Sequence, residues 1–229
     1  MKTIRLLYPD HVSGGLDTYY FGANLLQYIL PQNPNQPVVD IIPPNSKEKT
    51  VTNGIYAEEE VLSGIRDAQE KISKQNPDRI ITIGGNCMVS LAPFDYLHGK
   101  YKNVGIIWID AHPDINTDKT TVTGNIHGMP VAALIGMGEQ SLTRILSDKP
   151  KVKPSNIVML GLRDIDPPEM AFLNKLHIRY YTWQQMATLG IQRCIDETLQ
   201  YLSHLQNVHI SFDIDVMDPA YLPGVSVPV

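Results

Sequence analysis

The sequence predicts an α/β protein in which a mostly parallel sheet lies between two layers of helices. Along its 229 residues, short runs rich in β-branched residues alternate with longer amphipathic stretches. This alternation is typical of a parallel sheet covered by helices on both faces. The length fits one large domain better than two small ones, and a hydrophobic content of 43% is enough for a sizeable core. With no repeat or evident linker, residues 1–229 are expected to form a single domain.

The short apolar runs predict the strands, and the amphipathic stretches between them predict the helices. In chain order, strands are expected near residues 2–8, 38–42, 79–84, 104–109, 156–161, 177–181 and 207–213. Helices are expected near residues 17–30, 56–75, 88–98, 128–137, 139–147, 168–175 and 190–205. The proline-bounded stretch 31–37 and the polar stretch 43–53 are expected to be surface loops.

Composition narrows the classes of partner and the compartment. A net charge of -5 and a sequence pI near 5.8 argue against nucleic acid or an anionic membrane, so a small molecule is the expected partner. The apolar run at the N-terminus is too short for a signal peptide, and no run approaches transmembrane length, so a cytoplasmic protein is expected. Cys87 and Cys194 lie far apart in unlike contexts, which suits a reducing compartment.

Five chemically suited side chains follow two of the expected strands. Asp110, His112 and Asp114 come after the run 104–109, and Asp213 and Asp215 follow the run 208–212. Ligands bind beyond the carboxyl ends of such strands, and alternate residues of an extended backbone share one side. Four carboxylates with one imidazole suit one or two divalent cations, so the sequence predicts a metal-dependent hydrolase. Alternatively these are turn residues and helix caps, which explains one Asp better than five converging groups.

A more specific pattern runs through four segments in order. They read DAHPDINT at 110–117, TGNIHGMP at 123–130, GLRDIDP at 161–167 and SFDIDVMDP at 211–219. Together they span most of the chain and resemble the arginase/ureohydrolase family. The resemblance implies an arginase-like three-layer α/β/α fold that holds two Mn(II) ions. In that family a hydroxide that bridges the two ions attacks the guanidinium carbon of the substrate and releases urea.

The resemblance assigns the metal ligands. Asp110 and Asp213 would bridge both ions, Asp114 would complete one site, and His112 and Asp215 would complete the other. Carboxylates suit the hard Mn(II) ion, an imidazole is acceptable, and two adjacent cations lower the pKa of a bridging water. Asp114 would also accept a hydrogen bond from the bridging hydroxide and orient its attack.

A second histidine has a different expected role. His127 matches the family histidine that shuttles a proton to the leaving amine, a task suited to a group that titrates near neutrality. The alternative is a histidine at a helix start with no chemical role.

Substrate recognition is expected to favour amino-acid guanidines. Asn116 and Thr123 match family positions near the substrate carboxylate, and Asp166 matches a position near its ammonium group. This set resembles arginase proper more than agmatinase. Alternatively, Asp166 is a helix N-cap and Thr123 an ordinary turn residue.

The glycine-rich segment after the third expected strand departs from the family pattern. The family usually has a metal-binding histidine there, whereas here Gly84, Gly85 and Asn86 lead into Cys87. A thiolate is softer than an imidazole and favours Zn(II) or Fe(II) over Mn(II), so one site is expected to be weak, altered or empty. Alternatively, Cys87 is a small buried thiol packed at a helix start.

The C-terminus is the second departure, because the sequence stops within a recognisable family loop at 223–229. Val227 stands where arginases commonly place a threonine that contacts the guanidinium. The family's next glutamate, strand and terminal helices are missing, so the fold is expected to lack the last strand and the C-terminal helices, as an incomplete domain or with another arrangement in the gap. Because that strand usually lies inside the sheet, unpaired backbone groups and exposed apolar surface are expected.

The leading hypothesis is therefore hydrolysis of a guanidino or amidine compound, above all L-arginine to L-ornithine and urea. An agmatinase-like or formimidoylglutamase-like hydrolase is one alternative. Another is a non-catalytic binding protein with an arginase-like fold, motivated by Cys87, Val227 and the short C-terminus. The resemblance implies a homo-oligomer, although the sequence carries no interface signal of its own.

Overall fold

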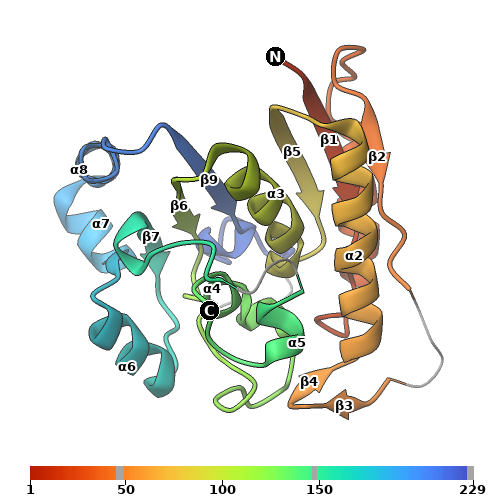
Figure 1. Ribbon diagram of the computed structural model, residues 1–229. Helices are drawn as coiled ribbons and strands as arrows, with labels where there is room; N and C mark the ends of the chain where they lie inside the picture. The colour runs from red at the N-terminus through yellow and green to blue at the C-terminus, as the bar shows by residue number, and fades with distance from the viewer. Residues whose placement is uncertain (45–48, 146–148, 226–229) are drawn as a thin grey trace.

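The computed structural model describes residues 1–44, 49–145 and 149–225 of the chain (Figure 1). Its strands are β1 (Thr3–Tyr8), β2 (Val38–Asp40), β3 (Val51–Thr52), β4 (Ile55–Tyr56), β5 (Arg79–Gly84), β6 (Val104–Ile109), β7 (Ile157–Leu162), β8 (Arg179–Thr182) and β9 (Asn207–Phe212). Its α-helices are α1 (Thr18–Ile29), α2 (Glu58–Gln75), α3 (Leu91–Tyr101), α4 (Pro130–Leu134), α5 (Gln140–Thr143), α6 (Pro167–Leu176), α7 (Trp183–Leu189) and α8 (Ile191–Tyr201). Short 3-10 helices are η1 (Cys87–Ser90), η2 (Ile126–Gly128), η3 (Pro154–Asn156) and η4 (Ile214–Val216). None of the helices described is both long and apolar enough to cross a bilayer.

The large strands pair in parallel, as the sequence predicts. One sheet has the order β2-β1-β5 and the other the order β8-β7-β6-β9. In the second sheet Ile109 of β6 pairs with Phe212 of β9, so these two strands end at the same height. The residues that follow them therefore emerge side by side.

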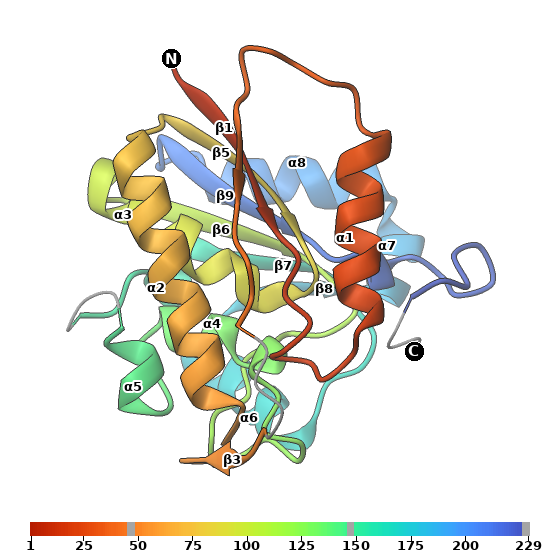
Figure 2. The ribbon, with the colours of Figure 1, turned by 90° about the vertical axis from the view of Figure 1, so that its right-hand side faces the viewer.

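The main core lies on the face of the sheets that α2 and α3 cover (Figure 2). Because successive side chains of a strand point to opposite faces, alternate residues of β1 and β6 enter this core. Ile4 and Leu6 of β1 are fully buried there, as are Ile106 and Trp108 of β6. Helix α2 is favoured locally by three glutamates in its first turn and by Asn76 in a left-handed conformation at its end.

Helices on the opposite face complete a three-layer α/β/α arrangement, which confirms the predicted fold class. Helix α1 packs over β1 and β5 through a small cluster of Leu7, Ala23 and Ile83. A second cluster joins β7 to α8 through Val158 and Cys194. Figure 2 shows α1 on the side of the sheet away from α2.

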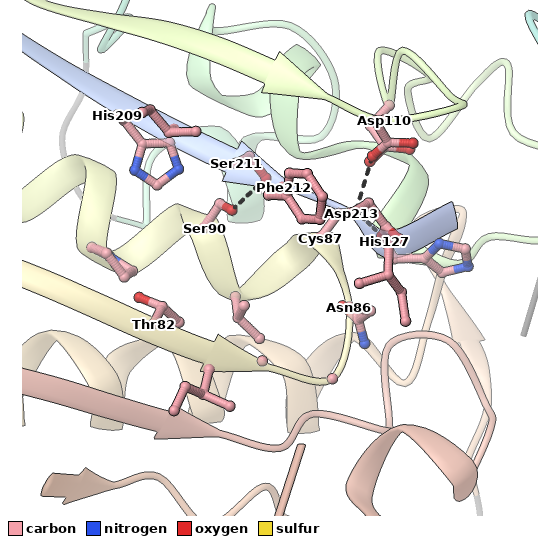
Figure 3. Close-up of a pocket in the computed structure, with 18 of the residues that line it drawn as sticks. Thr82, Asn86, Cys87, Ser90, Asp110, His127, His209, Ser211, Phe212 and Asp213 are labelled. Atoms are coloured by element: carbon pink, nitrogen blue, oxygen red, sulfur yellow. Dashed lines mark hydrogen bonds between the residues drawn. The ribbon is translucent and has the colours of Figure 1, made fainter. Parts of the chain in front are cut away.

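Between these two clusters the sheet is open. Within the described part of the chain, β5 pairs only with β1 and β9 only with β6, so each keeps one unpaired edge. Both strands line a cavity of about 1400 Å³ (Figure 3). Apolar side chains are exposed beside it: Ile81 of β5 is 42% exposed, and Ile210 and Phe212 of β9 are 61% and 59% exposed. Unpaired edges and exposed apolar surface were expected from the sequence.

Several boundaries differ from the predictions. The stretch 43–53, expected to be loop, contains β3, the first strand of the hairpin β3-β4, whose turn residues Asn53 and Gly54 both have positive φ. Asn-Gly between β-branched residues is a strong hairpin signal that the prediction overlooked. Helix α7 was not predicted either, although Thr182 caps it by accepting a hydrogen bond from Gln185 N.

The helices predicted over 128–137 and 139–147 are shorter than expected. The first is reduced to α4, after which Gly136 has a φ of 82°. The second is reduced to α5, and residues 146–148 at its predicted end lie outside the described residues.

Candidate metal centre

The sheet itself positions two carboxylates. Asp110 follows β6 and Asp213 follows β9, and these strands are hydrogen-bonded neighbours. The amide of Asp213 donates to the carbonyl of Ile109 at 2.8 Å, and the amide of Asp110 donates to the carbonyl of Leu160 at 3.0 Å. Both residues thus extend the strand ladder, and their side chains leave the sheet at its carboxyl edge.

A first group of metal-capable atoms contains Asp110, His112 and Asp215, all within 4.8 Å of one another. The Nδ1 atom of His112 lies 3.0 Å from Asp215 Oδ2 and 3.4 Å from Asp110 Oδ1. The backbone fixes these carboxylates, since the amide of His112 donates to Asp110 Oδ1 at 2.7 Å and the amide of Ala111 donates to Asp215 Oδ1 at 3.1 Å.

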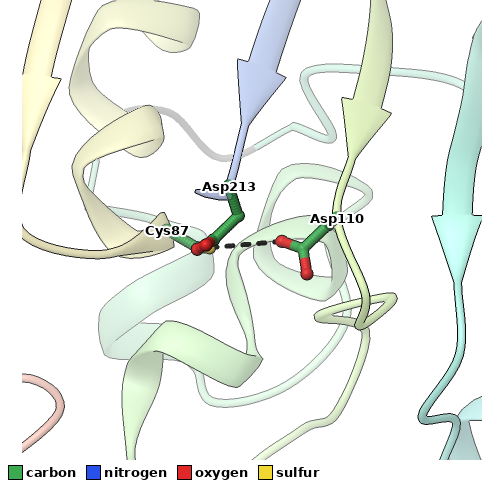
Figure 4. Close-up of side chains that lie close together, drawn as sticks. All are labelled: Cys87, Asp110 and Asp213. Atoms are coloured by element: carbon green, nitrogen blue, oxygen red, sulfur yellow. Dashed lines mark hydrogen bonds between the residues drawn. The ribbon is translucent and has the colours of Figure 1, made fainter. Parts of the chain in front are cut away.

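A second group contains Cys87, Asp110 and Asp213 (Figure 4). The Cys87 thiol lies 3.0 Å from Asp213 Oδ2 and 3.4 Å from Asp110 Oδ2. Asp110 belongs to both groups, so the two positions that can hold an ion are neighbours.

Asp114 reaches the same region by a different backbone path. Its φ is 49°, in the left-handed region, so the argument from an extended backbone does not apply to it. The residue is only 4% exposed, and its Oδ2 atom has no partner among the described residues. A buried carboxylate oxygen without a partner is costly unless something binds it, which fits a metal or a bound water.

The buried carboxyl groups of the site carry an excess of negative charge, which divalent cations would neutralise. Burial raises the pKa of Asp110 to about 7, although its hydrogen bond with His112 acts in the opposite direction. Burial raises the pKa of Asp114, with Asp110 adding to the shift. Burial lowers the pKa of His112, but hydrogen bonds to Asp110 and Asp215 outweigh it and raise that pKa to about 11. Oxygen donors with one imidazole and one thiol fit a pair of divalent cations.

His127 lies on η2 and lines the same cavity (Figure 3). Burial lowers its pKa, and the charge of His112 lowers it further. Its imidazole is therefore neutral near pH 7 and able to accept a proton.

The three residues expected to bind the substrate also line the cavity. Asn116 Nδ2 donates to Asp166 Oδ2 at 2.9 Å, so these two form one polar unit. Thr123 is exposed, and its Oγ1 atom accepts a hydrogen bond from Asn125 N at 3.1 Å, as a turn residue would. Asp166 also occupies the N-cap position of α6. Val227 lies outside the described residues.

Sequence reasoning missed two buried acids that support the site. Asp10 follows β1 and is 2% exposed, and its Oδ2 atom accepts from Asn86 Nδ2 at 2.8 Å. Glu169 accepts from the amides of Ile115 and Asp166 at 3.0 and 3.1 Å, and burial raises its pKa to about 7. The position of Asp10 beyond a strand end and the Asp-Pro-Pro-Glu capping-box spacing were the available signals.

Comparison with known proteins places this geometry in a family. A model of the arginase family matches residues 33–229. The chain belongs to the arginase family. Arginase from Bacillus subtilis strain 168 is 37% identical over 171 residues, which cover 74% of this chain and 58% of that protein. Arginase from Bacillus caldovelox is 36% identical over 176 residues, covering 73% of this chain and 58% of that protein. This arginase-family chain thus spans less than two thirds of these relatives.

Solved structures agree with the sequence comparison. The arginase of Bacillus caldovelox superposes with a TM-score of 0.81 at 28% identity, covering 100% of this chain and 81% of the other. The arginase of Entamoeba histolytica, solved with L-ornithine, gives a TM-score of 0.82 at 26% identity, covering 99% of this chain and 80% of the other.

Proposed function

We propose that the chain carries the metal centre of a hydrolase that cleaves the guanidino group of L-arginine to give L-ornithine and urea. The observation that carries this proposal is the pair of carboxylates Asp110 and Asp213 on adjacent parallel strands, each within reach of further donors. The two relatives compared above by sequence are arginases, and the Entamoeba histolytica enzyme was solved with L-ornithine.

Two divalent cations fit the donor sets. One would be held by Asp110, His112 and Asp215, and the other by Asp110, Asp114 and Asp213, with Cys87 beside them. The bound pair would supply Lewis acidity and make a water nucleophilic near neutral pH. We assign Mn(II) to the His112 position, because its carboxylate and imidazole donors suit that ion.

The remaining side chains have roles that follow from their positions. The Oδ2 atom of Asp114, which has no partner among the described residues, would accept a hydrogen bond from the attacking water and orient it. His127, neutral and at the cavity wall, would accept the proton released by the attacking water and pass it to the leaving amine. Asn116 and Asp166 offer a donor and an acceptor to the α-amino acid end of the substrate, and Thr123 lies on the same rim. We also propose that the protein forms a homo-oligomer.

The test is product release by the Mn(II)-loaded chain from L-arginine, agmatine and formiminoglutamate. Urea from L-arginine in preference to the other two is expected. A chain that binds two ions per molecule yet releases neither urea nor formamide would overturn the proposal and favour a non-catalytic binding protein.

His127 provides a residue-level check of the mechanism. His127→Asn is expected to lower kcat by about a hundredfold or more without changing metal content, because general acid and base groups contribute factors of that order. His177→Asn is the matched control, since His177 is exposed and has a positive φ that asparagine tolerates. Equal kcat values for the His127 variant and the parent chain would remove this residue from the mechanism.

A further inference from the structure

Cys87 sits among the acidic side chains of the candidate centre rather than at its margin (Figures 3 and 4). Its sulfur lies 3.0 Å from Asp213 Oδ2 and 3.4 Å from Asp110 Oδ2, and the residue is 9% exposed. These two carboxylates are among those proposed above to hold the second ion. An ion bound between them would meet the sulfur as well.

The loop before Cys87 is held in place by polar contacts and close packing. The side chain of Asn86 donates to the carbonyl and to the carboxylate of Asp10, and its Oδ1 atom accepts from Ser13 Oγ and Met88 N. Gly85 packs so tightly that an added Cβ would lie 1.9 Å from Asp10 O. These contacts fix the backbone that carries Cys87 before a ligand arrives.

A second observation points to a missing ligand at the same place. Asp114 lines the same cavity as Cys87, and its buried Oδ2 atom has no partner in the described part of the chain. The thiol and this carboxylate thus line one cavity, in which no described group binds the Oδ2 atom of Asp114. A cation there would bind both.

We infer that the Cys87 position binds a divalent ion through a thiolate, together with Asp110, Asp114 and Asp213, and that it selects a thiophilic ion such as Zn(II) or Co(II) over Mn(II). This rests on the proposed function. On binding, the Sγ–H bond breaks, the proton leaves to solvent, and the sulfur lone pair forms the bond to the ion. Sulfur is a soft donor, whereas the Asp110, His112 and Asp215 position has only oxygen and nitrogen donors.

The consequence is a centre with two unlike positions. A thiolate adds a negative charge that an imidazole would not, and it increases preference for softer ions at one position only. The chain would therefore be loaded best by a mixture of a thiophilic ion and Mn(II), and less well by Mn(II) alone.

The experiment titrates the metal-free chain of 229 residues with Co(II) and follows the near-ultraviolet charge-transfer absorption of a cobalt-thiolate bond. The parent chain and Cys194→Ser are expected to develop this band with one equivalent of Co(II). Cys87→Ser and Cys87→His are expected to lose it, and Cys87→His should gain Mn(II) relative to Zn(II) in competition. Cys194 is the matched control because it is also buried but lies in the cluster with Val158 and Leu160. Circular dichroism checks that each variant is folded.

The outcomes separate this inference from the proposed function. Bound Co(II) without the charge-transfer band, or a band that survives in Cys87→Ser, overturns the thiolate ligand and leaves the metal centre in place. Failure of a folded parent chain to bind any divalent ion overturns the metal centre, the proposed function and this inference together.

Discussion

Among single residues, His209 shows how burial alone can couple this fold to pH. It lies on β9 with its ring edge-on to Phe94, at a centroid distance of 5.7 Å. Its Nε2 atom is buried without a partner among the described residues, and burial lowers its pKa from 6.5 to about 4. The folded state therefore favours the neutral imidazole, and the need to protonate this imidazole destabilises the fold only at acidic pH.

The sign of the effect follows from the direction of the shift. Because the folded pKa is below the unfolded value, the stabilisation is present above pH 6.5 and is lost as the pH falls towards 4. His209 is expected to account for up to about 3 kcal/mol of that loss. Urea unfolding above pH 6.5 and near pH 4 should show a smaller loss for His209→Phe than for the parent chain. His98→Phe is the control, since His98 stacks on the same Phe94 ring; an equal loss in all three proteins would contradict the assignment.

How much of the site could be predicted depends on the residue. The five expected metal ligands were placed together by one argument, that parallel strands end at one edge, and the structure brings them there; their roles stay predictions. That argument does not apply to loops. The left-handed backbone of Asp114 and the hydrogen bond between Asn86 and Asp10 were therefore not predicted. Long-range contacts of this kind depend on packing that no local pattern records.

At the scale of elements, the turn from β5 into η1 sets the position of Cys87. Gly85→Ala is expected to destabilise the fold by about 1–3 kcal/mol, because the new Cβ would meet the Asp10 carbonyl at 1.9 Å and the backbone must move. A Cβ added at Gly22, in the middle of α1, would meet nothing within 4 Å. Gly22→Ala is therefore expected to stabilise the fold by up to about 1 kcal/mol. The free energy of unfolding in urea is measured for both variants and for the parent chain. If the Gly85→Ala variant is as stable as the parent chain, the turn can accommodate a Cβ at position 85 and this prediction is wrong.

Elements were predicted where they are long and periodic. The six-residue strands and α2 emerged close to their expected limits, because each carries a run of apolar residues long enough to show a period. The hairpin β3-β4 has two residues in each strand, and α7 follows β8 without an intervening loop, so neither is long enough to show a period.

At the scale of the whole molecule, the open region between β5 and β9 exposes apolar side chains beside a cavity. Ile210 is 61% exposed on β9, which has one unpaired edge within residues 1–44, 49–145 and 149–225, and such surfaces pair with other chains. The chain of 229 residues is expected to self-associate through this region, and Ile210→Lys should shift it towards monomer in sedimentation velocity. Ile42→Lys, at a 78% exposed position after β2, is expected to leave the distribution unchanged. Identical profiles for the parent chain and Ile210→Lys would contradict the role of β9.

The register between β6 and β9 has one more consequence. The amide protons of Asp110 and Asp213 are donors in the strand ladder, so deuterium replaces them only when the ladder opens. The spacing of these two carboxylates is therefore set by the distance between neighbouring strands, and it stays the same when the surrounding loops move. Both carboxylates are already in position when an ion arrives, so binding the ion costs little conformational entropy.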